Sequence, residues 1–274
     1  MQWASWEKHY NRITKRLGIS PEDDHESTRI LHHYFRDQLV QIQMQMKRLK
    51  RLCQSPTLVF GAGPSLRTDL RECLDSDLQP LCTFIAADGA TSEFIRNQVY
   101  PSIIVTDLDG DMNDIEEASR KGSLLVIHAH GDNTERIIEW VPRLLQFNPI
   151  PTTQVEPMPP IENFGGFTDG DRAVFMAIEC GCTMLALCGF DLGLVVGQTS
   201  KPEFAKDVIA SPRKGEKLEI AAELLQELKK NASWDKPVSF FNLTARTAIK
   251  LQGFATSSPR KFAKHLKNSL CKEQ

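Results

Sequence analysis

Acidic residues follow several of the short apolar runs in this 274-residue sequence, each at the point where a run ends. If the runs are parallel strands, their ends meet at one edge of a sheet, where ligands of open α/β sheets bind. Carboxylates brought within a few ångströms of one another repel unless a cation compensates their charge. Mg²⁺ prefers carboxylate, water and phosphate oxygens, so we expect a Mg²⁺-bound polyphosphate at this edge. The residues concerned are Asp88, Asp107, Asp109, Asp132 and Asp191.

The segment Asp107-Leu108-Asp109-Gly110-Asp111 holds the densest group of these acids. Alternate residues of an extended chain share a side, so Asp107 and Asp109 can face one cation. Gly110 lets the backbone turn tightly between them and the next element. Asp111 precedes a helical pattern that begins at Met112, and we expect it to be the N-cap of that helix. The first two acids of the segment therefore predict a metal site.

A glycine-rich segment, Gly61-Ala62-Gly63-Pro64-Ser65, follows the first apolar run and precedes a helical stretch. Its backbone N–H groups are expected to meet an anion at the helix N-terminus. The segment lacks the third glycine of the dinucleotide fingerprint and the lysine of a Walker loop. Because Asp88 ends the next run, where a ribose-binding acid would stand, an enzyme that uses a nicotinamide or S-adenosylmethionine is an open alternative.

The pattern His128-Ala129-His130-Gly131-Asp132 is compatible with zinc, because alternate residues that leave a strand share a face. A zinc hydrolase needs further ligands downstream, and no histidine occurs between Gly131 and Lys264. We therefore expect His128 and His130 either to frame the loop or to contact a phosphate or a base edge. The pair Cys180 and Cys182 has no matching second pair, so it does not predict a structural zinc site.

A second glycine-rich segment, residues 163–172 (NFGGFTDGDR), combines aromatic, acidic and basic side chains before a helical stretch. It is either a turn in which an aspartate caps the helix or a clamp over a ligand. In a clamp, an aromatic ring stacks on a flat ligand, a carboxylate pairs with ring N–H groups and an arginine meets phosphate. Two lysines farther along could add positive charge, although a solvated turn explains them equally well. The candidates are Asn163, Phe167, Asp169, Asp171, Arg172, Lys214 and Lys217.

Six continuous apolar runs are the predicted strands that position these groups. Continuous rather than alternating runs suit strands that are covered on both faces, as in a parallel sheet. Helical patterns occupy several of the intervals between them. We therefore predict an α/β fold: a Rossmann-like, mostly parallel sheet with helices on both faces. The strands are predicted at residues 57–60, 81–87, 102–106, 124–130, 183–190 and 238–241, and helices at 112–121, 134–145, 171–181 and 217–230.

Three regions are predicted: an N-terminal helical arm (1–54), an α/β catalytic domain (55–250) and a basic C-terminal tail (251–274), either a short helix or frayed. The arm is expected to form two helical pieces separated by residues 18–24, where Ser20-Pro21 and two acids supply helix-breaking and capping groups. The second piece has an apolar stripe that suits packing on the body or on a second subunit of a homodimer. We expect no chemistry from the stripe, which comprises Leu31, Phe35, Leu39, Ile42, Met46 and Leu49.

The composition is that of an ordinary globular protein, 41% hydrophobic and 25% charged, with a formal net charge of -2. This charge argues against a nucleic-acid partner, which requires a basic face. No apolar stretch approaches the roughly 20 residues of a membrane helix and the N-terminus has no signal core, so we expect a cytoplasmic protein with no membrane partner. The seven cysteines are expected to be reduced thiols in the core.

Six motifs in the central half of the chain resemble, in the same order, those of the archaeal 6-hydroxymethyl-7,8-dihydropterin pyrophosphokinases. They are GAGPSL, AADGA, VTDLDGD, HAHGDN, NFGGFTDGDR and CGFDLG, between residues 61 and 193. The succession of ADG, Asp-x-Asp and Asp-x-Thr is also similar to that of thiamine pyrophosphokinases, whose acids hold Mg²⁺ on ATP. Leu192 departs from the family pattern, in which we expect an aromatic residue.

The resemblance implies roles for individual residues. Asp107, Asp109 and Asp132 would hold the metal, with Asp88 close by. Either Asp88 or Asp132 would take the proton of the acceptor hydroxyl. The implied nucleotide contacts are Gly61, Gly63, Pro64, Ser65, Asn133 and Thr134, and residues 163–172 would close over the pterin or the phosphates.

The implied activity is Mg²⁺-dependent transfer of the terminal diphosphate of ATP to 6-hydroxymethyl-7,8-dihydropterin, leaving AMP. The product would enter folate or methanopterin biosynthesis. Two alternatives stay open: a nucleotide-sugar-dependent transferase on the same scaffold, which would not use ATP as donor, and a non-catalytic nucleotide-binding module whose arm contacts a partner. Release of AMP belongs to the first activity alone.

Overall fold

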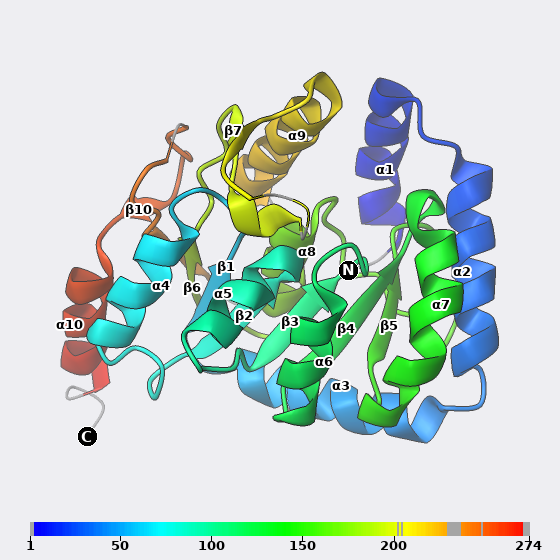
Figure 1. Ribbon diagram of the computed structural model, residues 1–274, viewed down its shortest axis with the longest axis horizontal. Coiled ribbons are helices and arrows are strands. Elements are labelled where there is room, and N and C mark those ends of the chain that lie inside the picture. The colour runs from blue at the N-terminus through cyan, green and yellow to red at the C-terminus, as the bar shows by residue number, and fades with distance from the viewer. Residues whose placement is uncertain (1–2, 202, 204, 229–236, 248, 271–274) are drawn as a thin grey trace.

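An eight-stranded sheet forms the centre of the computed structural model, which describes residues 3–201, 203, 205–228, 237–247 and 249–270 (Figure 1). Every strand pair in this sheet is parallel, in the order β10-β9-β6-β1-β2-β3-β4-β5. The predicted α/β fold with a parallel sheet is confirmed. The strands are β1 (Thr57–Phe60), β2 (Thr83–Ala87), β3 (Ile103–Thr106), β4 (Leu124–Ala129), β5 (Ile150–Thr153), β6 (Met184–Cys188), β9 (Ser239–Asn242) and β10 (Ala255–Thr256).

The two edge strands, β5 and β10, are missing from the sequence-based prediction. β5 contains Pro151, which has no N–H to donate to a neighbouring strand. The sequence signal for a strand is therefore weak there, and such a strand is expected at the edge of a sheet. β10 has two residues and leaves no apolar run to detect. Five of the six predicted strands, in contrast, are buried over nearly their whole length, which explains their continuous apolar character. The exception is β9, in which Ser239 is exposed and Phe241 is partly buried.

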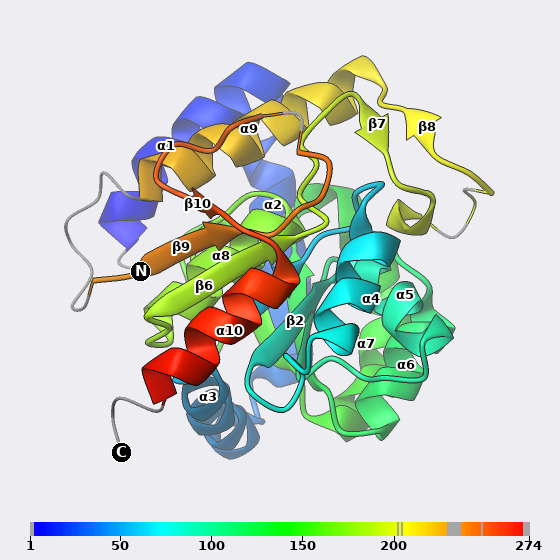
Figure 2. The same ribbon diagram turned by 90° about the vertical axis from the view of Figure 1, so that its left-hand side faces the viewer.

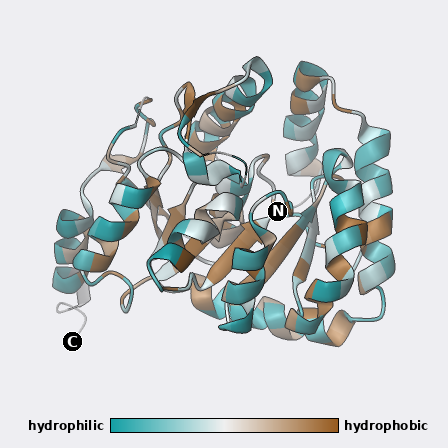
Figure 3. Ribbon diagram, viewed as in Figure 1, coloured by the Kyte–Doolittle hydropathy of each residue, from teal (hydrophilic) through white to brown (hydrophobic). Residues whose placement is uncertain are grey.

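Helices cover both faces of the sheet (Figures 1 and 2). On one face lies α8 (Asp169–Glu179), and α1 (Trp3–Leu17) and α9 (Pro212–Leu228) pack onto it. The other face is covered by α4 (Leu66–Asp75), α5 (Thr91–Arg96), α6 (Met112–Arg120), α7 (Thr134–Leu144) and α10 (Pro259–Leu270). The strands are hydrophobic along their length, whereas many helices turn hydrophilic residues outward (Figure 3).

The N-terminal arm contains three helices, α1, α2 (Pro21–Phe35) and α3 (Leu39–Cys53), rather than the two predicted pieces. Residues 36–38 are not helical, so the apolar stripe is divided between α2 and α3 and is not continuous on one helix. Leu31, Phe35 and Ile42 pack in a buried cluster with α6, α7 and strand residues, which confirms packing on the body. Leu39 is 50% exposed, and the homodimer stays a prediction.

The segment between β6 and α9 leaves the sheet and forms a small hairpin of β7 (Val195–Val196) and β8 (Val208–Ile209). α9 begins at Pro212, five residues before the predicted start, as the tolerance of proline in a first helical turn allows. In the tail, α10 is a packed helix rather than a frayed end, because Phe262, Ala263 and Leu266 are buried with α4.

The cysteine prediction is confirmed for the six cysteines in the described chain, which are all buried and free. They are Cys53, Cys73, Cys82, Cys180, Cys182 and Cys188; Cys271 lies outside the described residues. Among the described helices, none is both long and apolar enough to cross a bilayer.

Candidate active site

A cavity of about 470 Å³ lies at the edge of the sheet where the parallel strands end. Its walls come from the loops after β1, β2, β3, β4 and β6 and from the first turns of α8 and α9. The arm supplies a further wall through the turn between α1 and α2, which the sequence did not suggest. The arm residues that line the cavity are Gly18, Ile19, Ser20, Asp23 and Asp24.

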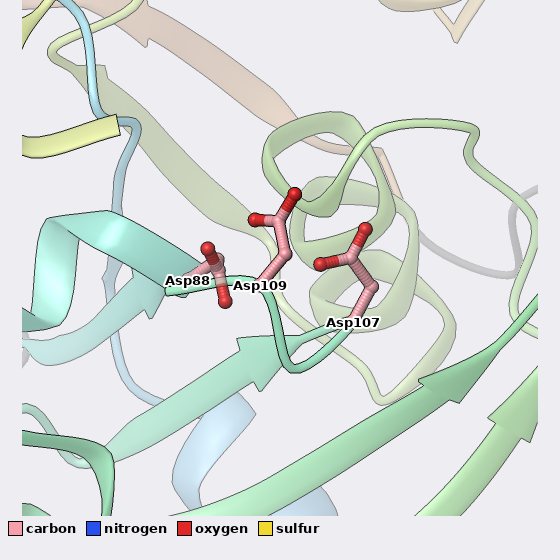
Figure 4. A group of neighbouring side chains, drawn as sticks. All are labelled: Asp88, Asp107 and Asp109. Atoms are coloured by element: carbon pink, nitrogen blue, oxygen red, sulfur yellow. The ribbon is translucent and has the colours of Figure 1, made fainter. Parts of the chain in front are cut away.

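Three carboxylates meet in this cavity, each on a loop that follows a strand (Figure 4). One oxygen atom from each of Asp88, Asp107 and Asp109 lies within 4.8 Å of the others. Asp88 follows β2, and the other two follow β3, the neighbouring strand. The parallel sheet therefore brings these three acids together, as the sequence pattern predicts.

A hydroxyl and a tight turn fix the loop that holds these acids. Thr106, at the end of β3, donates its hydroxyl to Asp88 Oδ1 at 2.5 Å and accepts the N–H of Leu108 at 2.8 Å. Leu108 has a φ of 69° and a buried side chain, so its acidic neighbours face the cavity. A Cβ on Gly110 would lie 2.9 Å from Asp88 Oδ2, so a larger residue there would displace the Asp88 carboxylate. Thr106 is a positioning residue that the carboxylate pattern alone did not reveal.

His130 keeps Asp107 ionised. Its Nε2 lies 3.1 Å from Asp107 Oδ2, and its Nδ1 accepts the N–H of Asp132, which leaves Nε2 as the donor to Asp107. Burial opposes ionisation of Asp107, but the hydrogen bond from His130 and the positive charges of Lys217 and Arg172 outweigh it and lower the pKa of Asp107 to about 2. Asp107 therefore carries its charge throughout the neutral range.

Two further acids in the cavity experience the opposite effect. Burial raises the pKa of Asp88 well above its usual range, and the charges of nearby carboxylates, Asp107 first, raise it further. Burial and the charge of Asp107 likewise raise the pKa of Asp169, at the start of α8. Ionised Asp107 and the two acids repel one another, so the group gains stability from any cation placed among them.

The donor set fits a divalent metal ion. Asp107 Oδ1 is buried and has no hydrogen-bond partner among the described residues. An unpaired buried carboxylate oxygen is costly unless something binds it. Because three carboxylates converge beside the cavity, the site offers the oxygen ligands that Mg²⁺ takes from proteins while leaving room for water and phosphate.

Asp132, which the resemblance places on the metal, lies apart from this group. Its side chain is 64% exposed and sits 3.8 Å from the Arg213 guanidinium. Directly after β4 the chain enters a single 3₁₀ turn, Gly131–Asn133, and this turn leaves Asp132 at the rim of the cavity. The structure therefore assembles Asp88 with Asp107 and Asp109, and not Asp132.

The N–H groups of the Gly61–Ser65 segment bind acceptors within the protein. The segment follows β1 as predicted, and Pro64 has no N–H to offer. An anion would therefore meet few free donors in this segment, contrary to the expectation from its glycines. The hydrogen bonds run from Gly61 N–H to Cys188 O, from Gly63 N–H to Gly189 O and from Ser65 N–H to Asp191 Oδ2.

Two buried carboxylates, Asp191 and Asp69, anchor this segment. The Ser65 hydroxyl lies 2.9 Å from Asp191 and 3.1 Å from Asp69. Asp69 also accepts the N–H groups of Gly189 and Ala245, at 2.7 and 3.0 Å. Burial raises the pKa of Asp69 to about 7 and also raises the pKa of Asp191. Asp191 lines the cavity, whereas Asp69 lies within α4, so its position gave no sequence signal.

Asn133 and Thr134, implied as nucleotide contacts, use their polar groups inside the protein. The Asn133 amide donates to Asp107 O at 2.8 Å and to His128 O at 2.7 Å. Thr134 donates to Ser27 on α2 at 3.0 Å. Neither residue lines the cavity, and Asn133 is a brace for the loop that holds Asp107.

The 163–172 segment contains a helix cap and a cavity wall. Asp171 is fully buried and accepts the N–H groups of Phe167 and Thr168, at 2.6 and 2.8 Å, so it is the N3 residue of a capping box in which Thr168 is the N-cap of α8. The Asn163 amide donates to Val155 O and accepts the N–H of Gly165. It stabilises the segment and does not line the cavity. Phe167, Asp169 and Arg172 line the cavity.

Cations surround the acidic group. Arg172 is buried, donates to Phe167 O at 2.8 Å and has a partnerless Nε within the described chain. Lys214 and Lys217 project from the first turns of α9, with Lys217 Nζ 5.8 Å from the Phe167 ring centre. Lys201, which is not among the residues predicted from the sequence, lies 2.9 Å from Asp109 Oδ2. The cavity therefore combines a set of acids that could hold a metal ion with positive charges suited to phosphate.

Comparison with known proteins gives one family match and several similar proteins. Residues 33–197 match the model of the MptE-like family, described as 6-hydroxymethylpterin diphosphokinase MptE-like. The 6-hydroxymethyl-7,8-dihydropterin pyrophosphokinase of Pyrococcus furiosus is 41% identical over 234 residues, which cover 84% of this chain and 96% of that protein. The protein of the same name from Methanothermobacter thermautotrophicus is 42% identical over 232 residues, 84% and 97% of the two chains. Among solved structures, the MAf glycosyltransferase from Magnetospirillum magneticum AMB-1 matches with a TM-score of 0.44 and 15% identity, over 84% of this chain and 41% of that one.

Proposed function

The chain belongs to the MptE-like family of 6-hydroxymethylpterin diphosphokinases, and from this premise we propose that it transfers the terminal diphosphate of ATP to 6-hydroxymethyl-7,8-dihydropterin and releases AMP. It is a transferase of the pterin pyrophosphokinase type. We propose Mg²⁺ as the metal and ATP as the donor. The product would enter folate or methanopterin biosynthesis.

The acidic group supports this proposal most directly. Asp107 and Asp109, with Asp88 beside them, would hold Mg²⁺ through carboxylate oxygens, and Asp107 Oδ1 has no other partner in the described chain. When bound, the ion would draw charge from the phosphate oxygens. Lys214, Lys217 and Arg172 line the same cavity and would neutralise the rest of the polyphosphate charge.

The protein's own part in the transfer is to position groups and to control charge. The acceptor hydroxyl must approach the β-phosphorus in line with the departing AMP, and both reactants would bind in the cavity beside the acidic group. For the hydroxyl proton, Asp88 is better placed than Asp132, because Asp88 lies within the group and Asp132 is mostly exposed beside Arg213. Asp191, a carboxylate on the cavity wall, is proposed to accept ring N–H groups of the pterin.

The proposal is tested by incubating the purified protein with ATP, Mg²⁺ and 6-hydroxymethyl-7,8-dihydropterin and separating the products by chromatography. AMP and pterin diphosphate should form together, and EDTA should abolish both. A parallel reaction with UDP-glucose in place of ATP should give no transfer. Transfer from the nucleotide sugar without AMP release from ATP would favour the glycosyl-transferring alternative, and nucleotide binding without any product would favour a non-catalytic module.

His130 should influence the reaction through Asp107. We expect His130→Ala to lower kcat by about 10- to 100-fold, because the residue that orients a metal-binding carboxylate is lost. Without the His130 donor the pKa of Asp107 rises from about 2, so protonation of Asp107 interferes at higher pH. The acid limb of the kcat/KM profile should move to higher pH in the variant.

His25, an exposed histidine on α2, provides the matched control. His25→Ala should leave both kcat and the acid limb at their wild-type values. An unshifted acid limb in His130→Ala would show that His130 does not set the ionisation of Asp107.

A further inference from the structure

Lys201 makes direct contact with the acidic group. Its Nζ lies 2.9 Å from Asp109 Oδ2, and the two side chains are only partly exposed, at 34% and 22%. The residue lies in the segment between β7 and β8, immediately after a 3₁₀ turn at Gln198–Ser200. This segment projects from the sheet rather than belonging to it, yet its lysine reaches the catalytic edge.

Close backbone contacts hold this segment against the site. A Cβ on Gly89 would lie 2.1 Å from Thr199 O, and a Cβ on Gly197 would lie 2.5 Å from Ala62 O. Both glycines therefore permit an approach that any larger residue would block. Gly89 directly follows Asp88, so the backbone that positions Lys201 rests on the same loop that supplies a carboxylate of the group.

The Lys201 ammonium and a metal ion would compete for the same carboxylate, that of Asp109. Three converging carboxylates need positive charge nearby, and Lys201 supplies it through Asp109. A divalent ion on the same carboxylate group would repel the ammonium, since both are cations within a few ångströms of each other. We propose that Lys201 is an exchangeable cation, which holds Asp109 in the metal-free protein, leaves it when Mg²⁺ and the polyphosphate bind, and then donates to a phosphate oxygen.

The second half of this inference rests on the proposed function. In that reaction the acceptor hydroxyl oxygen bonds to the β-phosphorus while the bond from that phosphorus to the oxygen of the α-phosphate breaks. The electron pair of the broken bond stays on AMP, and the hydroxyl proton passes to a base. Negative charge grows on the departing AMP oxygen, and an ammonium on a flexible stem suits donation to it.

Metal binding without nucleotide tests the exchange. Mn²⁺, which takes the same oxygen ligands, serves as the probe, and its free concentration is read by electron paramagnetic resonance. Lys201→Met should bind Mn²⁺ roughly tenfold more tightly than the wild type, because the competing ammonium is gone. Lys201→Arg keeps the charge and should remain near the wild-type affinity. Lys206→Met removes an exposed lysine of the same segment and should change nothing.

Turnover tests the proposed contact of Lys201 with phosphate. Here Lys201→Met is expected to weaken the protein's function, although the same substitution strengthens metal binding. Lys201→Met should lose about 10²-fold in kcat despite tighter metal binding, Lys201→Arg should recover part of it, and Lys206→Met should match the wild type. If Lys201→Met binds Mn²⁺ no more tightly than the wild type does, the proposed exchange is wrong. The proposed function still stands in that case, provided that the wild type releases AMP. A full kcat in Lys201→Met would overturn the contact with phosphate. A wild type that releases no AMP would overturn the proposed function, and the Mn²⁺ affinities would still decide the exchange.

Discussion

Asp109→Asn is expected to lower kcat by at least about 10³-fold while the protein stays folded. The substitution removes one ligand oxygen and one negative charge from the group that would hold Mg²⁺, and transfer of a diphosphate depends on that charge compensation. Stability should change little. The partly exposed pair with Lys201 contributes about 1 kcal/mol or less, and the repulsion from Asp88 and Asp107 is relieved at the same time. Release of AMP gives kcat, and thermal unfolding reports the fold.

Asp111, two residues further on, provides a matched control. It caps α6 by accepting the N–H of Asn113 at 3.0 Å, and asparagine caps a helix as well as aspartate does. Asp111→Asn therefore removes the same charge from the same loop without removing a ligand, and it should retain wild-type turnover. Wild-type turnover in Asp109→Asn would contradict the assignment of Asp109 to the metal site. An equal loss of kcat in both variants would instead indicate a general effect of charge.

Asp24→Leu should destabilise the protein by about 3 kcal/mol, because it leaves buried donors without acceptors. Asp24 is buried on α2. It accepts the N–H of Gly131 at 2.7 Å, the Tyr10 hydroxyl at 2.8 Å and the Gln154 amide at 2.7 Å. One side chain thus joins α1, α2, the loop after β4 and the chain after β5. The melting temperature should fall by roughly 6 to 12 °C, and turnover should fall as well, since Gly131 adjoins His130.

Tyr10→Phe separates the loss of one bond from the loss of the shared acceptor. It removes a single hydrogen bond to Asp24 and keeps the packing of the ring, so it should cost about 1 kcal/mol. If Asp24→Leu costs no more than Tyr10→Phe, the arm is not anchored through this carboxylate. A normal melting temperature with lost turnover would instead restrict the role of Asp24 to the cavity wall.

The central part of the fold was predictable because its signals are local. Strands buried on both faces are continuously apolar, and acids that follow neighbouring parallel strands lie at one edge of the sheet, so Asp88, Asp107 and Asp109 meet as expected. Asp132, which was expected in the same group, is turned to the rim of the cavity by the 3₁₀ turn after β4. Asp111 is the predicted cap of α6. The family resemblance drawn from six short motifs is confirmed by the match of residues 33–197 and by the curated relatives.

Other features depend on contacts that no local pattern encodes. The arm reaches the cavity through Asp24, whose partners lie more than 100 residues away except for Tyr10. Lys201 lies in an irregular segment whose path is set by two glycine contacts. The Gly61–Ser65 segment has the sequence of an anion site, but neighbouring carbonyl and carboxylate groups accept its N–H groups. In each case the outcome is set by tertiary contacts rather than by propensity.

The fate of the γ-phosphate of ATP tests the central claim most directly. With [γ-³²P]ATP, Mg²⁺ and 6-hydroxymethyl-7,8-dihydropterin, the wild type should place the label in pterin diphosphate, with one unlabelled AMP formed for each labelled product, and Asp109→Asn should place almost none there. Labelled pterin monophosphate together with ADP, or a label that remains entirely in ATP, would contradict the proposed transfer of a diphosphate group.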